Sequence, residues 1–270
     1  MRRSSFALLA LAVVFLAAGT ARAQDRRRAE EWMRQCDDSY DRDGGNFCEL
    51  RDLTIQPAGT IGVDARPNGG VAFHGWGRAE VKVVAVVQAH ARDDAQAQAL
   101  AKQVRIETGG SRIRAEGPPT ARREWWSVSF EVYVPRQSNL EATTMNGGVS
   151  ADSVDGRLDF EATNGGIHLT DVAGDVRAET TNGGVSATLG GSTWKGQGLD
   201  LRTTNGSVTL TIPRGYNARL ETGTTNGGMN IDFPITVQGT IGRRITTQLG
   251  AGGPLVRAIT TNGAVRIRQQ

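Results

Sequence analysis

Carboxylates at two-residue spacing are the side chains of this sequence that come closest to a catalytic pattern. Pairs of carboxylates on one face of a protein cleave glycosidic bonds, one as acid and the other as base or nucleophile. Outward charges of both signs are, however, the ordinary state of an exposed strand. We therefore expect ion pairs and no catalysis from the following residues: the acidic Asp159, Glu161, Asp175, Glu179, Asp200 and Glu221, and the basic Arg157, Arg177, Arg202 and Arg219.

Other chemistry has little support in the residue pattern. The sequence has no nucleophile-elbow, phosphate-loop or dinucleotide-binding motif, so we expect neither an enzyme nor a cofactor. The three histidines (His74, His90 and His168) lack the spacing of metal ligands. The two cysteines, Cys36 and Cys48, are predicted to form a disulfide in an oxidising compartment.

Two tryptophans are candidate contact residues. Trp194 lies in a glycine-rich insert, where it either contacts a partner or folds back over the apolar column. Trp125 and Trp126 are adjacent and must point to opposite faces of a strand. Trp126 shares its face with Val128 and Phe130 and is expected in the core, which leaves Trp125 exposed for a sugar or another partner.

The elements that carry these residues are defined by a repeat. Asn-Gly pairs recur at spacings of 18, 18, 23, 21 and 36 residues, and the last spacing is twice the first. An apolar residue stands three and five positions after almost every asparagine, so apolar side chains recur on one strand face. The repeated asparagines are Asn146, Asn164, Asn182, Asn205, Asn226 and Asn262, with a related Asn68-Gly69-Gly70 upstream.

Each repeat therefore predicts two short strands and two turns, and stacked repeats bury a column of Val, Ile and Leu. We predict a mainly β fold, a β-solenoid (β-helix-like) with Asn-Gly turns. An antiparallel meander of hairpins is the competing fold, because Asn-Gly is a strong hairpin signal. The asparagines either form a side-chain ladder between repeats or occupy positive-φ turn positions.

The region before the repeats also reads as β structure. Residues 80–91 and 126–134 predict strands, and residues 104–107 and 113–116 predict two short strands about Gly109-Gly110. The segment 93–103 is rich in Ala and Gln, begins with two aspartates and predicts one short helix.

The repeats resemble a known family. Val132-Tyr-Val-Pro135, Leu140 through Asn146-Gly-Gly, the Thr-Asn-Gly-Gly segments and the closing Gly250-Ala-Gly-Gly-Pro254 are similar to the bacterial "putative adhesin" family of β-strand-repeat proteins. The resemblance covers about residues 55–270. It implies interaction at the cell envelope and supplies no catalytic residues.

The N-terminus predicts export. Two arginines, an apolar run over 6–18 and Ala21-Arg22-Ala23 indicate a signal peptide over 1–23, with an uncleaved anchor as the alternative. Cleavage removes three arginines and leaves 28 residues of each sign, so the charge gives no reason to expect nucleic-acid binding. We divide the rest into a polar segment over 24–52 with the disulfide and a β-repeat domain over 53–270, regular over 140–270.

The sequence thus predicts an exported envelope module, periplasmic or at the cell surface, without a transmembrane segment in the mature chain. Its expected partner is an envelope component or a second copy. The alternatives are a glycan-binding protein and, further behind, a polysaccharide-active enzyme.

Overall fold

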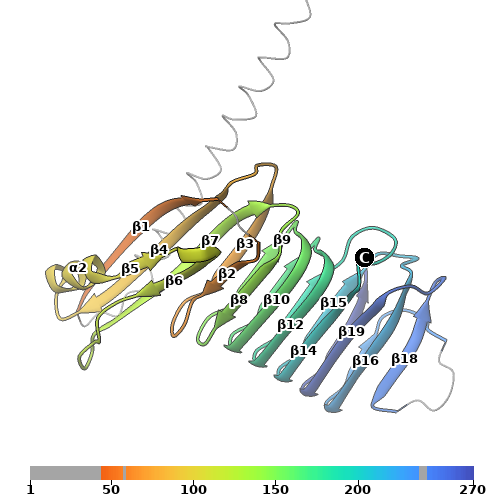
Figure 1. Ribbon diagram of the computed structural model, residues 1–270. Coiled ribbons are helices and arrows are strands. Elements are labelled where there is room, and N and C mark those ends of the chain that lie inside the picture. The colour runs from red at the N-terminus through yellow and green to blue at the C-terminus, as the bar shows by residue number, and fades with distance from the viewer. Residues whose placement is uncertain (1–43, 57–58, 237–241) are drawn as a thin grey trace, which may run out of the picture.

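The computed structural model describes residues 44–56, 59–236 and 242–270. The described chain forms two ten-stranded sheets, sheet A and sheet B, with one α-helix at the end where β1 and β5 lie (Figure 1). The predicted signal peptide and Cys36 lie outside the described residues. Cys48 is half-buried in β1, and its disulfide with Cys36 stays a prediction.

The strands of each sheet follow in spatial order. Sheet A contains β1 (Gly45–Ile55), β4 (Val81–Ala91), β7 (Trp125–Pro135), β3 (Val71–Trp76), β9 (Val149–Asp152), β11 (Ile167–Thr170), β13 (Val185–Thr188), β15 (Val208–Ile212), β20 (Val265–Gln269) and β17 (Met229–Ile231). Sheet B contains β18 (Arg244–Leu249), β16 (Ala218–Asn226), β19 (Leu255–Asn262), β14 (Gly198–Asn205), β12 (Ala173–Asn182), β10 (Asp155–Asn164), β8 (Leu140–Thr144), β2 (Ile61–Asp64), β6 (Arg112–Glu116) and β5 (Arg105–Glu107).

Successive strands of the repeats alternate between the two sheets, and each pairs in parallel with the equivalent strand of the next repeat. Val176 of β12 faces Leu158 of β10 on one side and Leu199 of β14 on the other. Antiparallel pairs join β1 to β4, β4 to β7, β5 to β6 and β16 to β18. The predicted parallel stacking therefore holds for the Asn-Gly repeats and the hairpin meander is wrong there, whereas β18, within the region predicted as regular over 140–270, pairs antiparallel with β16.

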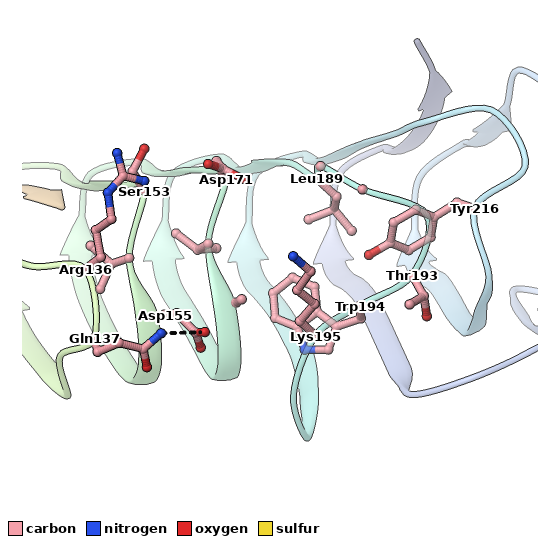
Figure 2. A pocket seen from close by; sticks show the side chains of 15 residues that line it. Arg136, Gln137, Ser153, Asp155, Asp171, Leu189, Thr193, Trp194, Lys195 and Tyr216 are labelled. Carbon is pink, nitrogen blue, oxygen red and sulfur yellow. Dashed lines mark hydrogen bonds between the residues drawn. The ribbon is translucent and has the colours of Figure 1, made fainter. Parts of the chain in front are cut away.

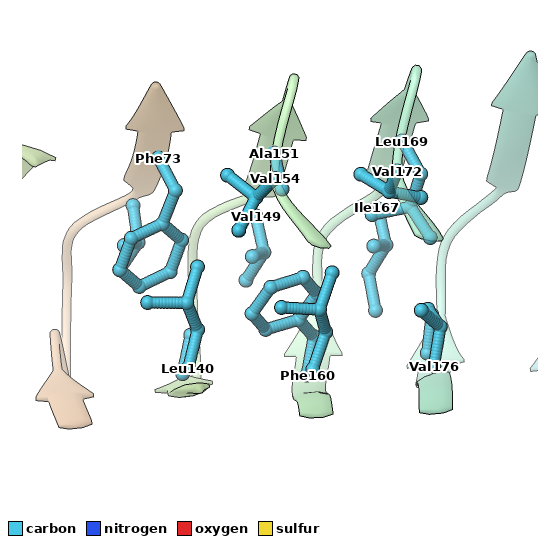
Figure 3. Packing of buried hydrophobic residues seen from close by; sticks show 14 of the residues in the cluster. Phe73, Leu140, Val149, Ala151, Val154, Phe160, Ile167, Leu169, Val172 and Val176 are labelled. Carbon is cyan, nitrogen blue, oxygen red and sulfur yellow. The ribbon is translucent and has the colours of Figure 1, made fainter. Parts of the chain in front are cut away.

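The core lies between the sheets, where the apolar columns of the two inner faces meet (Figure 3). Phe73 and Phe160 stack with ring centroids 5.6 Å apart. Val176 is 1% exposed, whereas His168 is exposed and its Nδ1 lies 2.6 Å from Ser186 Oγ. The inward and outward positions read from the repeat are thereby confirmed.

The last two repeats are not stacked in sequence order. β19 lies between β14 and β16, and β20 lies between β15 and β17. The chain therefore skips one position after β15, forms β16 and β17, and returns to fill the gap with residues 255–269. The 36-residue spacing predicts two consecutive periods, and this prediction is wrong because β19 and β20 are inserted between strands formed earlier in the chain.

The short helix was predicted correctly. α2 runs Asp94–Gln103, and the Asp93 side chain caps it by accepting a hydrogen bond from the Gln96 N–H at 2.8 Å. The 3-10 turn η1 (Gly109–Ser111) joins β5 to β6. Strand β1 begins at Gly45 and so runs across the boundary predicted between residues 52 and 53.

The repeated asparagines form a ladder on the surface. Each side-chain amide donates at 2.8–2.9 Å to the Oδ1 of the asparagine that precedes it in the spatial order Asn68, Asn146, Asn164, Asn182, Asn205, Asn262 and Asn226. These asparagines are all exposed at the corner between the sheets, and five of them are the last residues of β10, β12, β14, β16 and β19. None has a positive φ, so the turn-position alternative is wrong.

A second ladder lies beneath the asparagines. A buried threonine stands two positions before the asparagine of a repeat. Its hydroxyl donates a hydrogen bond to a glycine carbonyl of the neighbouring repeat, and that glycine directly follows the asparagine there. Thr180 donates to Gly165 in this way at 2.8 Å. Thr203 and Thr260 repeat the contact with Gly183 and Gly206. The Thr-Thr-Asn-Gly motif therefore fixes the distance between repeats at this corner.

Candidate functional site

The irregular features of the chain converge at the opposite corner, where the sheet A strands end. Ser153 and Asp171, which follow β9 and β11, have φ values of 58° and 50° and turn the chain toward sheet B. The next such turn is replaced by the insert of residues 189–197. The regular corner is thus interrupted after β13, and a hollow forms there.

The insert is held rigidly on both sides. The Thr193 hydroxyl donates to the Asn217 carbonyl at 2.9 Å, and the Asn217 side chain donates to the Ser192 carbonyl at 3.1 Å. The Gly174 N–H donates to the Lys195 carbonyl at 2.7 Å. A loop with this many anchors keeps its shape without a ligand.

Trp194 is part of the core. It is 4% exposed, and its indole N–H donates to the Gly174 carbonyl at 3.0 Å. Of the two interpretations left open by the sequence, the structure favours the tryptophan that folds back over the apolar column. Trp194 lines the hollow while it is almost fully buried, so it forms part of the wall.

The hollow has a volume of about 250 Å³ and a mainly polar lining (Figure 2). Its charged groups are Arg136, Asp155, Asp171 and Lys195, two of each sign, and the phenol of Tyr216 completes it. Asp155 accepts a hydrogen bond from Gln137 at 3.0 Å. Arg136 and Lys195 form no ion pair within the described part of the chain.

Tyr216 is the residue of this hollow with the clearest perturbation. Its side chain is 3% exposed, and burial raises the pKa of the phenol to about 12. The hydroxyl forms no hydrogen bond with another described residue. The Tyr216 hydroxyl is thus a neutral group at the edge of the polar hollow that can donate and accept a hydrogen bond. Sequence reasoning missed Tyr216 because a lone tyrosine after Pro213-Arg214-Gly215 carries no motif.

The carboxylates that suggested glycoside cleavage lie elsewhere, on the outer face of sheet B, and none of them lines the hollow. Asp200 pairs with Arg202 at 2.7 Å and Arg257 at 3.1 Å, and Glu221 pairs with Arg257 at 2.9 Å. Hydrogen bonding to Glu221 raises the pKa of Arg257. The expected ion pairs are therefore present in part: Arg257 pairs across neighbouring strands, Arg202 pairs within its own strand, and Arg157 and Arg219 form no ion pair with a described residue.

Two carboxylates of this face are less well partnered. Asp159 lies opposite Arg177 of β12, and its Oδ1 is buried without a hydrogen-bond partner in the described residues. Glu161 lies opposite Glu179, which pairs with Arg177 at 2.8 Å. Asp159 and Glu161 therefore remain the pair to mutate in any test for hydrolysis.

Trp125 is exposed, as predicted. Its ring is 44% exposed and stacks on His90 with centroids 5.8 Å apart. Trp126 is partly buried against the core, and its indole N–H donates to the Pro118 carbonyl at 2.9 Å. Trp125 begins β7, whereas Arg136 at the hollow follows the other end of that strand, so the structure does not bring the two candidate contact tryptophans together.

A second hollow of about 280 Å³ lies over β3, β7, β9 and β11. Its lining is mainly apolar and includes Ala72, Phe130 and Val149, with His168 at its border. Few polar groups line this second hollow, so few hydrogen bonds could fix the orientation of a ligand in it.

The comparison that decides the family is with sequence profiles. The profile of the Toastrack DUF4097 family matches residues 94–268, well over half of the chain. The chain belongs to the Toastrack DUF4097 family. The resemblance to an adhesin-like family of unknown function is thus confirmed at the level of the family. No curated protein matches this Toastrack chain.

Several solved structures resemble it distantly. A "putative cell adhesion protein" from Clostridium sporogenes ATCC 15579 is 10% identical, with 83% of this chain and 100% of that chain covered and a TM-score of 0.45. A "putative adhesin" from Bacteroides fragilis NCTC 9343 is 8% identical, with 82% and 97% covered and a TM-score of 0.36. A "putative lipid binding protein" from Parabacteroides distasonis ATCC 8503 is 11% identical, with 84% and 98% covered and a TM-score of 0.33. Similarity at this level says nothing about what the Toastrack chain binds.

Proposed function

We propose that the protein is an exported, non-catalytic interaction module of the bacterial cell envelope, and that the hollow beside Trp194 holds part of its partner. The observation that carries this proposal is the Tyr216 hydroxyl, which is unpartnered among the described residues at the edge of a rigid polar hollow. Loops on a rigid scaffold are the usual place for recognition. The insert of residues 189–197 is the largest departure from the regular repeat near this corner.

A saccharide suits this hollow better than an apolar ligand. The lining combines the phenol with charges of both signs that balance, so it offers both donors and acceptors without a strong net field. A volume of about 250 Å³ lies below the usual range for drug-sized ligands. The hollow therefore fits one small unit, such as a single sugar residue of a longer chain. The proposed saccharide site corresponds to the glycan-binding alternative raised by the sequence.

The absence of catalysis belongs to the proposal. The carboxylates of sheet B are spread over a strand face, and Asp200 and Glu221 are neutralised by arginines.

No described helix is long and apolar enough to cross a membrane. The proposal also includes export with cleavage before Gln24 and a periplasmic or surface location. It includes the Cys36–Cys48 disulfide as well. These parts of the proposal are supported by the signal-like N-terminus and the pair of cysteines.

The repeat itself is proposed to be an open β-solenoid whose Asn-Gly segments form one corner. Alternation of strands between the sheets and the parallel register support this description. Such a stack is a rigid rod that presents the hollow at a fixed place along its length.

The test compares Tyr216→Phe with the unaltered chain of residues 24–270 in binding fluorescently labelled saccharides released from purified cell walls and outer membranes. Because the hydroxyl forms no hydrogen bond with a described residue, the variant is expected to keep its melting temperature and to bind at least about fivefold more weakly, the loss of one hydrogen bond. Lys195→Ala should weaken binding in the same way. Unchanged binding in both variants would exclude this hollow as the site.

A further inference from the structure

The outer face of sheet A changes character toward the C-terminal end of the stack. Over β11, β13 and β15 its outward residues are uncharged and polar, and the strands contain no acidic residue. On β20 the same two positions are arginines. Two rows therefore cross the strands: His168, Ser186, Thr209 and Arg266 in one, and Thr170, Thr188, Thr211 and Arg268 in the other.

These two arginines lack the carboxylate partners that three arginines of the opposite sheet have, and in the described chain they share this unpaired state with Arg157 and Arg219 of sheet B. Neither Arg266 nor Arg268 forms an ion pair or a hydrogen bond with a described residue. The nearest acidic residue along the neighbouring strand, Asp232, accepts a hydrogen bond from Asn230 at 3.0 Å instead. By contrast, Arg177, Arg202 and Arg257 on β12, β14 and β19 of sheet B all pair with carboxylates.

The distribution of charge along the chain adds to this difference. Residues 140–199 contain eight acidic and three basic residues, whereas residues 200–270 contain three acidic and eight basic residues. The mature chain is neutral as a whole, but its C-terminal end is positive. An anion that approaches the stack is therefore drawn to that end, where the two unpaired guanidinium groups lie.

We propose that the outer face of β15 and β20 binds an acidic polysaccharide, with Arg266 and Arg268 on its sulfate, phosphate or carboxylate groups. The two arginines lie about 6.6 Å apart along the strand, on one face. Neighbouring strands add threonine hydroxyls at intervals of about 4.8 Å. An extended chain of sugars can lie across the strands along these rows, with its hydroxyls on the threonines and its anionic groups on the guanidiniums.

This inference names a ligand class for the proposed envelope-binding role and rests on that role. Its surface is nevertheless separate from the hollow at Tyr216. A flat, hydroxyl-lined face suits a polymer better than a compact anion, because a guanidinium on an open strand has no pocket to hold a single phosphate. The lining of this face is polar throughout, which gives a lipid chain nothing to bury against.

The experiment measures binding of the chain of residues 24–270 to dextran sulfate and to uncharged dextran at low and at physiological salt. The test variant carries Arg266→Gln with Arg268→Gln. The matched control carries Arg177→Gln with Arg202→Gln, which changes the net charge by the same amount on sheet B. We expect the test variant to bind dextran sulfate more than about tenfold more weakly, since each arginine near an anionic surface contributes roughly fivefold. The control should change less than about twofold.

Salt should weaken the binding of the unaltered chain, and uncharged dextran should bind poorly. Equal losses in the two double variants would overturn the proposal. So would binding to phosphatidylglycerol vesicles without binding to dextran sulfate, or self-association in sedimentation that the Arg266 and Arg268 substitutions abolish. Tyr216→Phe should leave dextran sulfate binding unchanged, so failure at the hollow and failure at this face can be told apart.

Discussion

The two glycines of one Asn-Gly-Gly segment should respond to alanine in opposite ways. A Cβ added at Gly183 would lie 2.1 Å from the Gly165 carbonyl oxygen of the neighbouring repeat, whereas a Cβ at Gly184 would lie 3.4 Å from the Ser207 oxygen. The sequence shows the same asymmetry, because the second position holds Ser207 and Ala264 in other repeats while the first is always glycine.

The cost at Gly183 follows from the contact. The two repeats must separate locally by about 1 Å to relieve the clash, which stretches the Thr180–Gly165 hydrogen bond now at 2.8 Å. Overpacking costs about 1–3 kcal/mol and a lost hydrogen bond about 1 kcal/mol more. Gly184→Ala reduces the freedom of the unfolded chain and should be neutral or stabilise by about 0.4–1 kcal/mol.

The melting temperatures of both variants, made in the chain of residues 24–270, are measured by thermal unfolding monitored with circular dichroism. At about 2–4 °C for each kcal/mol in a domain of this size, Gly183→Ala should lower the melting temperature by about 5–15 °C. Gly184→Ala should leave it unchanged or raise it slightly. Equal losses in the two variants would refute the close approach of neighbouring glycines.

Four further outcomes are expected. Val176→Asp should unfold the chain because it buries a charge without a partner, whereas His168→Asp should be tolerated on the surface; similar melting temperatures would show that the register is wrong. Trp194→Ala should lower the free energy of unfolding, measured in urea, by about 3–5 kcal/mol because the indole is buried. An unchanged free energy of unfolding would show that the indole is exposed. Burial raises the pKa of Tyr216 from 10.0 to about 12, which favours the neutral phenol in the folded state, so its contribution to stability is complete below pH 10 and lost as the pH rises to 12. Urea unfolding at pH 9 and pH 12 should therefore show a smaller loss in Tyr216→Phe than in the unaltered chain, and identical losses would argue against a buried phenol. Removal of residues 255–270 should abolish cooperative unfolding, because it takes β19 from between β14 and β16 and β20 from between β15 and β17, and a native melting curve would contradict the inserted order of β19 and β20.

Much of the fold is readable from the sequence because the repeat uses a strict period. Apolar residues at even offsets gave the buried face, which is why Val176 and His168 were placed correctly. The capped start of α2 at Asp93 was equally local. Local patterns, however, do not state which repeats are neighbours, and β19 could be placed between β14 and β16 only once the structure was known.

The site was harder to predict for a similar reason. Its lining comes from residues far apart in sequence, from Arg136 to Tyr216, and no spacing connects them. The sequence indicated the insert that borders the hollow but left the orientation of Trp194 open, because a large aromatic ring in a glycine-rich loop fits both an exposed contact and a buried wall. The unpaired state of Arg266 and Arg268 depends on which strands lie beside β20 and is likewise invisible in the sequence.

The most direct test of the proposed role is a paired measurement on purified cell-wall and outer-membrane polysaccharides. The chain of residues 24–270 is incubated with each polysaccharide, and the bound fraction and the number of new reducing ends are determined in the same sample. Binding without new reducing ends, weakened by Tyr216→Phe, is the predicted result. New reducing ends that disappear on mutation of Asp159 or Glu161 would contradict it and would identify a polysaccharide-cleaving enzyme instead.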